Sequence, residues 1–316
     1  MKTQTFFIPS YDEAKAICQA NDTFYEKIIE VNGVKVSVFN YRLSQFKDFS
    51  QPIEGSHITA YEMRGLTFVH EESGIKRYIQ LHKFFNLNQV PGYQFHEVEG
   101  YDVVRTQDKC DGSMIRFIMV NGQLVAKTKM DFSNDQCQMA MEVLNRNPKL
   151  KEFVLKTLTN NEAAIFELVS PLNCIVLKYA KTELVLLQIR DEDSGEYKDI
   201  FSHEGVKKYG VKCSKKEEVA KLQSYVDRQA TDENIEGWVL TLSNGQMMKV
   251  KTKWYCELHG LLSENLVREN KILEMILNDT MDDAMVQVES TDIRRKYAED
   301  IQKALIVYLD AKLHEV

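Results

Sequence analysis

The five residues Lys109–Ser113, with the sequence KCDGS, decide how the rest of the chain is interpreted. They stand between two mostly apolar alternating runs, at 101–105 and 114–118, so the sequence predicts a strand, a turn and a second strand. Gly112 lets the backbone bend and come close to a ligand. Burial or neighbouring cations free the lone pair of a lysine amine, so this turn can present Lys109 as a nucleophile. When the five residues are taken alone, a surface hairpin turn with a solvated lysine explains them better than a nucleophilic lysine does. The rest of the sequence is needed to distinguish between these two interpretations.

The composition is that of a soluble globular protein without a broad basic surface. The 316 residues are 44% hydrophobic and 28% charged, and the formal net charge is −7. This balance argues against a protein that coats nucleic acid nonspecifically, but it allows a local basic cleft. The six cysteines form no C-x-x-C pair, which favours free thiols in a reduced cytoplasm. No run approaches the roughly 20 apolar residues of a membrane helix, and the N-terminal apolar run is too short for a signal peptide.

Periodicity and turn residues predict an α+β fold dominated by antiparallel strands. Asn-Gly pairs at 32–33, 121–122 and 244–245 predict three hairpins, because such pairs supply the positive φ angles of tight turns. Capping boxes at Ser10 and Ser133 predict helix starts. Strands are expected at 62–69, 75–81, 163–169, 174–179 and 183–190, and helices at 10–20, 133–145, 149–158 and within 202–229. The pattern turns helical near its end, so we expect one domain at 1–258 and a small all-helical domain at 259–316.

Two lysine pairs have the period-two spacing that places side chains on one face of a strand. The pairs are Lys127 with Lys129 and Lys249 with Lys251. A solvated sheet face explains either pair taken alone, whereas two lysines on an inward face suit an anion such as phosphate.

Two glutamates stand where a carboxylate has a chemical use. Glu167 lies within the apolar run IFELV, and Glu236 precedes Gly237 ahead of the second lysine pair. Glu167 is either on the solvent face of an amphipathic strand or a ligand. Carboxylates beside phosphate-binding lysines suit ribose hydroxyls or Mg²⁺, which prefers oxygen ligands and keeps water.

The order of these signals is more specific than any one of them. The succession resembles the nucleotidyltransferase motifs of ATP-dependent ligases and capping enzymes, and more closely the phage RNA ligase 1 family. The resemblance covers about residues 25–260 and is carried by Arg64-Gly65, Lys83–Asn88, Lys109–Ser113, Asn234–Gly237 and Lys249–Tyr255. It implies an adenylyltransferase domain of an ATP-dependent RNA ligase, in a family that repairs broken tRNA in infected bacteria.

The resemblance also implies roles for the cations. Lys109 would attack the α-phosphorus of ATP, form a lysyl-adenylate and release pyrophosphate. Lys249 and Lys251 would bind the α-phosphate, and Arg64 and Lys83 would hold the outer phosphates. Chemistry of this kind depends chiefly on positioning and on neutralisation of charge.

For the acidic residues, the resemblance implies that Glu167 binds the ribose hydroxyls and that Glu236 organises a catalytic Mg²⁺, with Mn²⁺ as an alternative ion. Asp111 and Ser113 would support the turn. Asp282 resembles an acidic metal-binding position in the C-terminal domain, and a helix N-cap explains it at least as well.

Two aromatic residues also match the family. Tyr255 stands just after the second lysine pair, at an aromatic position of the family. Phe39 falls where a tyrosine contacts the nucleotide, so stacking is expected there without a polar contact.

The implied partners are ATP and a single-stranded or nicked-loop RNA, with tRNA as a candidate and a cytoplasmic monomer as the expected form. The tail after Trp254 is shorter than the C-terminal domain of the best-known members, which weakens the case for tRNA. A DNA ligase or capping enzyme usually appends an OB-fold barrel, whereas this tail is helical. A catalytically silent binding module of the same fold has no need to keep the complete set of lysines and glutamates.

Overall fold

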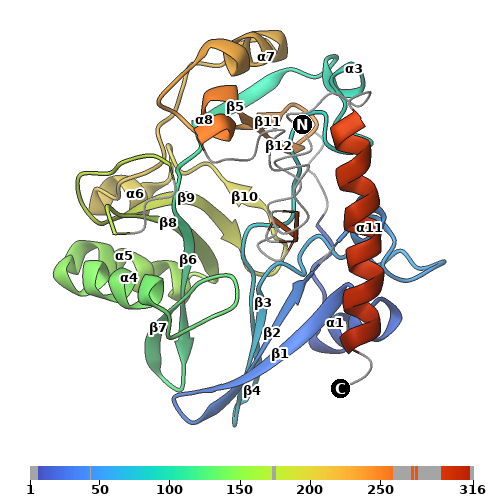
Figure 1. Cartoon of the computed structure of the whole chain (residues 1–316). Helices are drawn as coiled ribbons and strands as arrows, with labels where there is room; N and C mark the ends of the chain where they lie inside the picture. Colours follow the sequence, from blue (N-terminus) through green and yellow to red (C-terminus); the bar gives the residue numbers. More distant parts are fainter. Residues whose placement is uncertain are drawn as a thin grey trace. The chain divides into compact units, whose positions relative to one another are not determined.

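The computed structural model describes residues 6–42, 44–172, 176–258, 272–273, 275–276 and 293–313. The chain divides into two compact units, most of whose elements are labelled in Figure 1. Unit 1 contains Met1–Lys83 and Cys110–Lys216, and unit 2 contains Phe84–Lys109 and Glu217–Val316. The KCDGS stretch therefore begins in unit 2 and continues in unit 1.

The first sheet of unit 1 is antiparallel, in the order β1-β2-β3-β4. Asn32 and Gly33 have φ angles of 50° and 76°, which confirms the first predicted hairpin. Helix α1 (Tyr11–Ala20) begins at the Ser10 capping box and packs on β1. The strands, and the short helix after β2, are β1 (Phe24–Val31), β2 (Val34–Tyr41), α2 (Phe46–Ser50), β3 (Leu66–Glu71) and β4 (Gly74–Tyr78).

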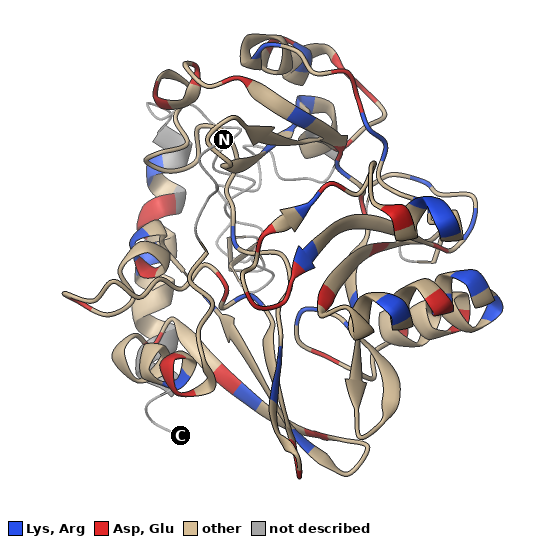
Figure 2. Ribbon diagram, turned by 180° about the vertical axis from the view of Figure 1, so that it is seen from behind, with Lys and Arg blue, Asp and Glu red and all other residues tan. Residues whose placement is uncertain are grey.

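The second sheet of unit 1 is also antiparallel, in the order β10-β9-β8-β6-β7. Helices α4 and α5 lie against one face of it (Figure 1), where Phe153 of α5 packs edge-on against Phe166 of β8. Figure 2 shows acidic and basic residues mixed along both helices. The elements are β6 (Ser113–Val120), β7 (Gln123–Lys127), α4 (Asp135–Arg146), α5 (Pro148–Thr159), β8 (Glu162–Val169), β9 (Glu183–Asp191), β10 (Tyr197–Lys198) and α6 (Glu204–Tyr209).

Unit 2 is built on three antiparallel strands in the order β12-β11-β5. Trp238 is fully buried at its centre and packs edge-on against Tyr225, with the ring centroids 5.7 Å apart. Helix α7 packs against α8 and β12. The elements are α3 (Phe95–Val98), β5 (Val103–Asp108), α7 (Leu222–Thr231), β11 (Gly237–Leu242), β12 (Met247–Lys251), α8 (Lys253–Leu258) and α11 (Ile293–Leu313).

The predicted α+β class is confirmed, but the strands on either side of Lys109–Ser113 do not form a hairpin. β5 pairs with β11, whereas β6 pairs with β7 and β8. The turn therefore connects two sheets, and the alternative of a simple surface hairpin is wrong.

Three predicted strands also need correction. The strand predicted at 75–81 ends at Tyr78 in the structure, as β4. β3 begins at Leu66 and not at residue 62, because Gly65 has a φ of 77°, which lies outside the strand region. Residues 176–179, the described part of the predicted strand 174–179, form no strand. The backbone N–H groups of Val176 and Leu177 donate instead to Oδ2 of Asp111.

The predicted helices are present, but some of them begin or end at other residues than predicted. Asn134, and not Ser133, caps α4, since its side chain accepts a hydrogen bond from the backbone N–H of Cys137. The insertion at 202–229 contains two helices, α6 and α7, with a non-helical segment between them. Helices α8 and α11 agree with a helical tail, while the boundary at 258/259 stays a prediction because 259–271 lie outside the described residues. Within the described part of the chain, no helix is both long and apolar enough to span a membrane.

Candidate active site

Three strand ends of unit 2 bring Lys109, Glu236 and Lys251 together. Lys109 follows β5, Glu236 precedes β11 and Lys251 ends β12. The backbone N–H of Lys109 donates to the carbonyl of Gly237, and Gly237 lies opposite Lys251 in the sheet. The antiparallel register thus places side chains from three distant parts of the sequence at one end of the sheet.

Glu236 is the centre of this cluster. Its Oε1 atom lies 2.6 Å from Nζ of Lys109 and 3.1 Å from Nζ of Lys251. The side chains of Glu236 and Lys251 are 2% and 8% exposed, whereas that of Lys109 is 23% exposed. The amine of Lys109 is therefore held by a buried carboxylate, on a side chain that is partly exposed.

Gly237 allows the backbone of Glu236 to approach β12 this closely. Its φ is 143°, and a Cβ atom there would lie 2.0 Å from the carbonyl oxygen of Val250. No other residue fits without displacing one of the two strands. The glycine after Glu236 therefore has a structural reason that is tied to the position of the carboxylate.

Lys249 and Tyr255 complete the predicted group of unit 2. Lys249 shares a face of β12 with Lys251, and its Nζ lies 5.9 Å from the ring centroid of Phe84. Nζ of Lys251 lies 5.2 Å from the ring centroid of Tyr255, which is buried. Each of these two ammonium groups therefore lies within cation–π range of an aromatic ring.

Glu236 also fits the implied metal ion. Its second oxygen, Oε2, is buried and has no hydrogen-bond partner among the described residues. The described residues contain no cluster of three or more His, Cys, Asp or Glu side chains that could hold a metal. A single carboxylate oxygen suits Mg²⁺, which takes one or two carboxylates and completes its shell with water and substrate phosphates. Asp282 lies outside the described residues.

Unit 1 contains the rest of the KCDGS stretch and Glu167. Asp111 anchors the loop at Val176 and Leu177, and its own N–H donates to the hydroxyl of Tyr179. Ser113 starts β6 opposite Leu168, so the next residue pair places Met114 opposite Glu167. Asp111 thus joins the turn to residues 176–179, and the supporting role of Ser113 stays a prediction.

Gly112 is required by the close approach of the turn to β8. A Cβ atom at this position would lie 2.3 Å from the carbonyl oxygen of Leu168 and 3.2 Å from Cγ of Glu167. Glu167 is mostly buried, and every residue of β8 is buried, so its carboxylate is not on a solvated strand face. The alternative of a solvated strand face is therefore wrong for Glu167, and its role as a ligand stays a prediction.

Cations of unit 1 gather around Tyr41. Nζ of Lys83 and Nζ of Lys129 lie 5.0 and 5.1 Å from the centroid of this ring. Arg64 is half-buried, and its guanidinium donates to Sδ of Met114 at 3.3 Å. The spacing of Lys127 and Lys129 marked this segment in the sequence, whereas no sequence signal pointed to Tyr41.

Phe39, on β2, is packed among other aromatic rings. It is fully buried and packs edge-on against Phe68, with the ring centroids 5.6 Å apart. Its expected contact with the nucleotide stays a prediction. Tyr41, two residues later on the same strand, offers its ring to lysines instead.

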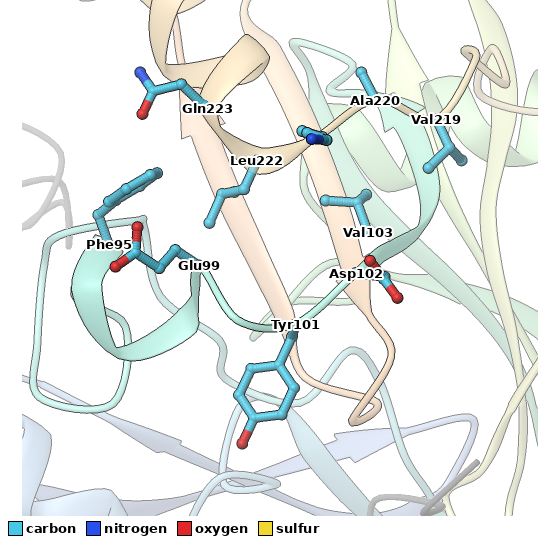
Figure 3. A pocket seen from close by; sticks show the side chains of 10 residues that line it. Phe95, Glu99, Tyr101, Asp102, Val103, Val219, Ala220, Leu222 and Gln223 are labelled. Atoms are coloured by element: carbon cyan, nitrogen blue, oxygen red, sulfur yellow. The ribbon is translucent and has the colours of Figure 1, made fainter.

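A separate hollow of unit 2 lies among α3, the start of β5 and α7 (Figure 3). Its volume is about 740 Å³, and its lining includes Glu99, Asp102 and Lys221. None of the described residues predicted for the site lines it. Two carboxylates against one lysine do not suit a polyphosphate, so we do not assign the nucleotide to this hollow.

The comparisons with known proteins agree with the ordered motifs. A family model described as RNA ligase matches residues 62–255. A protein of Thermovibrio ammonificans named "Putative RNA ligase" is 27% identical over 301 residues, which are 93% of this chain and 76% of that protein.

The fold also resembles two solved forms of an archaeal ATP-dependent RNA ligase. Form 2 aligns with a TM-score of 0.54 at 13% identity, over 94% of this chain and 76% of that one. Form 1 aligns with a TM-score of 0.51 at 13% identity, over 95% and 80%. At such low identity the likeness concerns the fold alone, and it confirms the expected nucleotidyltransferase architecture.

Proposed function

Because the chain belongs to the RNA ligase family, as its ordered motifs predicted, we propose that it seals RNA ends with ATP through a lysyl-adenylate. The observation that carries the proposal is the convergence of Lys109 and Lys251 on one oxygen of Glu236 at the ends of three neighbouring strands. A positioned amine, a second cation and a carboxylate with an available oxygen are the groups that nucleotidyl transfer uses.

In the first step, the deprotonated Nζ of Lys109 attacks the α-phosphorus of ATP. An N–P bond forms, the bond from the α-phosphorus to the bridging oxygen breaks, and pyrophosphate leaves with the electron pair. The buried carboxylate of Glu236 holds Nζ in position before the attack. Lys249 and Lys251 neutralise the charge that develops on the α-phosphate.

The residues of unit 1 are assigned to the remaining parts of the nucleotide. Lys83 and Lys129, which share the ring of Tyr41, suit the outer phosphates together with Arg64. Glu167 suits the ribose hydroxyls, because a buried carboxylate accepts hydrogen bonds from such groups. The support for these roles is the chemistry of each side chain and the family motif that it matches.

When it is bound, Mg²⁺ or Mn²⁺ supplies positive charge that offsets the charge of the phosphates. Glu236 is the residue we propose to hold it through Oε2. Asp282 is kept as a second candidate ligand.

In the second step, a phosphate oxygen at the 5′ end of RNA attacks the adenylate phosphorus, and the N–P bond to Lys109 breaks. In the third step, a 3′-hydroxyl oxygen attacks the 5′-phosphorus, a phosphodiester bond forms and AMP leaves. We propose single-stranded or nicked-loop RNA as the substrate, with RNA repair, including tRNA repair, as the role. A cytoplasmic monomer and a helical domain at 259–316 are parts of the same proposal, and limited proteolysis near residue 259 tests the domain boundary.

The test is the intact mass of the protein after incubation with ATP and Mg²⁺, beside the variant Lys109→Ala. We expect the parent to gain one adenylate and the variant to gain none. The parent is treated with pyrophosphate beforehand, so that any adenylate already present is removed. A 5′-phosphorylated RNA and a DNA of the same sequence then distinguish RNA sealing from DNA sealing. If the parent gains no mass, the proposed ligase activity is wrong, and a catalytically silent binding module explains the chain better.

A further inference from the structure

Lys127, at the end of β7, has a fully buried ammonium group. Its Nζ donates to the backbone carbonyls of Thr128 at 2.9 Å, Gly65 at 3.1 Å and Lys129 at 3.4 Å. An ammonium has three N–H donors and a neutral amine has two, so the three carbonyls match the charged form. A buried lysine charge is costly, and this one is balanced by three acceptors that it holds together.

The three carbonyls belong to two segments that are almost in contact. Gly65 has a φ of 77°, and a Cβ atom there would lie 2.5 Å from the carbonyl oxygen of Lys129. Nε2 of Gln80 donates to the carbonyl of Thr128, and the N–H of Gly65 donates to the carbonyl of Phe39. Lys127 therefore bridges the backbone at Gly65 and the backbone at Thr128 and Lys129 where the two segments approach most closely.

Each of the two bridged segments carries a cation of the candidate site. Arg64 directly precedes Gly65, and its guanidinium reaches Met114. Lys129 reaches the ring of Tyr41, over which Lys83 also lies. A shift of either backbone segment would move one of these cations relative to the others.

We infer that Lys127 is a positioning residue, whose buried ammonium clamps the carbonyls of Gly65, Thr128 and Lys129 and thereby fixes Arg64 and Lys129 to bind the outer phosphates of ATP. The inference rests on the proposed function, since it concerns the same nucleotide. Lys127 itself contacts backbone carbonyls and acts on the nucleotide only through Arg64 and Lys129.

The clamp, which is the set of three hydrogen bonds from Nζ of Lys127, depends on pH in the neutral range, because the amine can lose its proton there. The pKa of Lys127 is lowered to about 7, chiefly by burial, and the guanidinium groups of Arg116 on β6 and of Arg64 act in the same direction. Asp131, after β7, and the thiol of Cys137 on α4 act in the opposite direction. At pH 6 Lys127 is mostly protonated and all three carbonyls have a donor, whereas at pH 9 it is neutral and one carbonyl loses its donor.

The experiment compares the parent with Lys127→Met, which keeps an apolar stem and removes all three donors. The rate at which Lys109 gains AMP is measured against ATP concentration from pH 6 to pH 9. At pH 6 we expect the half-saturating ATP concentration to rise at least tenfold in the variant, with a smaller change in the maximal rate. Toward pH 9 this ratio should fall, because the parent loses the same charge. Lys149→Met, an exposed lysine on α5, is the matched control and should leave the ratio near one.

A second variant covers the case in which Lys127→Met does not fold. Lys127→Arg keeps a charge that does not titrate, so it should hold the half-saturating ATP concentration lower than the parent does at pH 9. Equal ATP dependence of parent and variants at both pH values overturns the clamp and leaves the proposed ligase intact. A parent that never gains AMP overturns both, so the two failures are distinguishable.

Discussion

A single oxygen of Glu236 binds two ammonium groups, so the charge of this residue positions both lysines of the cluster. The substitution Glu236→Gln keeps the shape and removes the charge, so two partly buried cations lose their shared partner. We expect the rate of AMP transfer to Lys109 to fall by roughly 100-fold or more. The half-saturating Mg²⁺ concentration should rise as well, because the candidate ligand loses its charge.

Glu233→Gln is the matched control, since Glu233 is an exposed carboxylate three residues earlier. It should leave both quantities within about twofold of the parent, as surface substitutions usually do. Comparable losses in the two variants would show that net charge matters and not the position of Glu236.

The sequence made Glu236 and its lysines recognisable through motif order, but it could not show their contacts. Lys127 illustrates the limit. Period-two spacing predicts that Lys127 and Lys129 share a face, yet β7 ends at Lys127, so the rule no longer applies to Lys129. One lysine is fully buried and the other lies over Tyr41, which neither local spacing nor composition could distinguish.

At the scale of elements, the turn between β5 and β6 requires a residue without a side chain at position 112. Gly112→Ala would place a Cβ atom 2.3 Å from the carbonyl oxygen of Leu168 on β8. We expect a loss of stability of about 1–3 kcal/mol, since a packed strand must move, together with slower AMP transfer to Lys109. Thermal or urea unfolding and the intact-mass assay measure the two effects.

Gly100→Ala provides the comparison, because no atom would lie within 4 Å of its Cβ atom and its φ is not positive. Its stability should stay the same or rise by about 0.4–1 kcal/mol through the unfolded chain. If Gly112→Ala behaved like Gly100→Ala, the close packing of the turn against β8 would be refuted.

The elements that sequence reasoning placed correctly are those with local causes. The Asn32-Gly33 hairpin and the Ser10 capping box are encoded within a few residues, and both are present. The partners of β5 and β6 are not local, since β5 pairs with a strand that begins more than a hundred residues later. The apolar content of residues 174–179 predicted a strand. It could not show that the backbone N–H groups of Val176 and Leu177 donate to the carboxylate of Asp111.

At the scale of the whole chain, the two units are each assembled from two separate segments. A change of composition near the C-terminus can indicate a boundary between two domains that are consecutive in the sequence. It carries no information about a segment such as Phe84–Lys109, which joins the unit formed by the later half of the chain. Such interleaving follows from strand pairing between β5 and β11, which the sequence pattern does not specify.

The net charge of −7 limits the number of RNA phosphates that the whole chain is expected to neutralise. An acidic protein that binds through a few placed lysines neutralises few phosphates, so it releases few counterions. For two to four phosphates on single-stranded RNA, the KM for a 5′-phosphorylated oligonucleotide should rise roughly 7- to 50-fold between 50 and 200 mM salt. AMP transfer to Lys109, measured without RNA at the same salt concentrations, shows that the first step remains intact. A rise above roughly 1,000-fold would mean eight or more neutralised phosphates, and it would contradict binding through a small local set of cations.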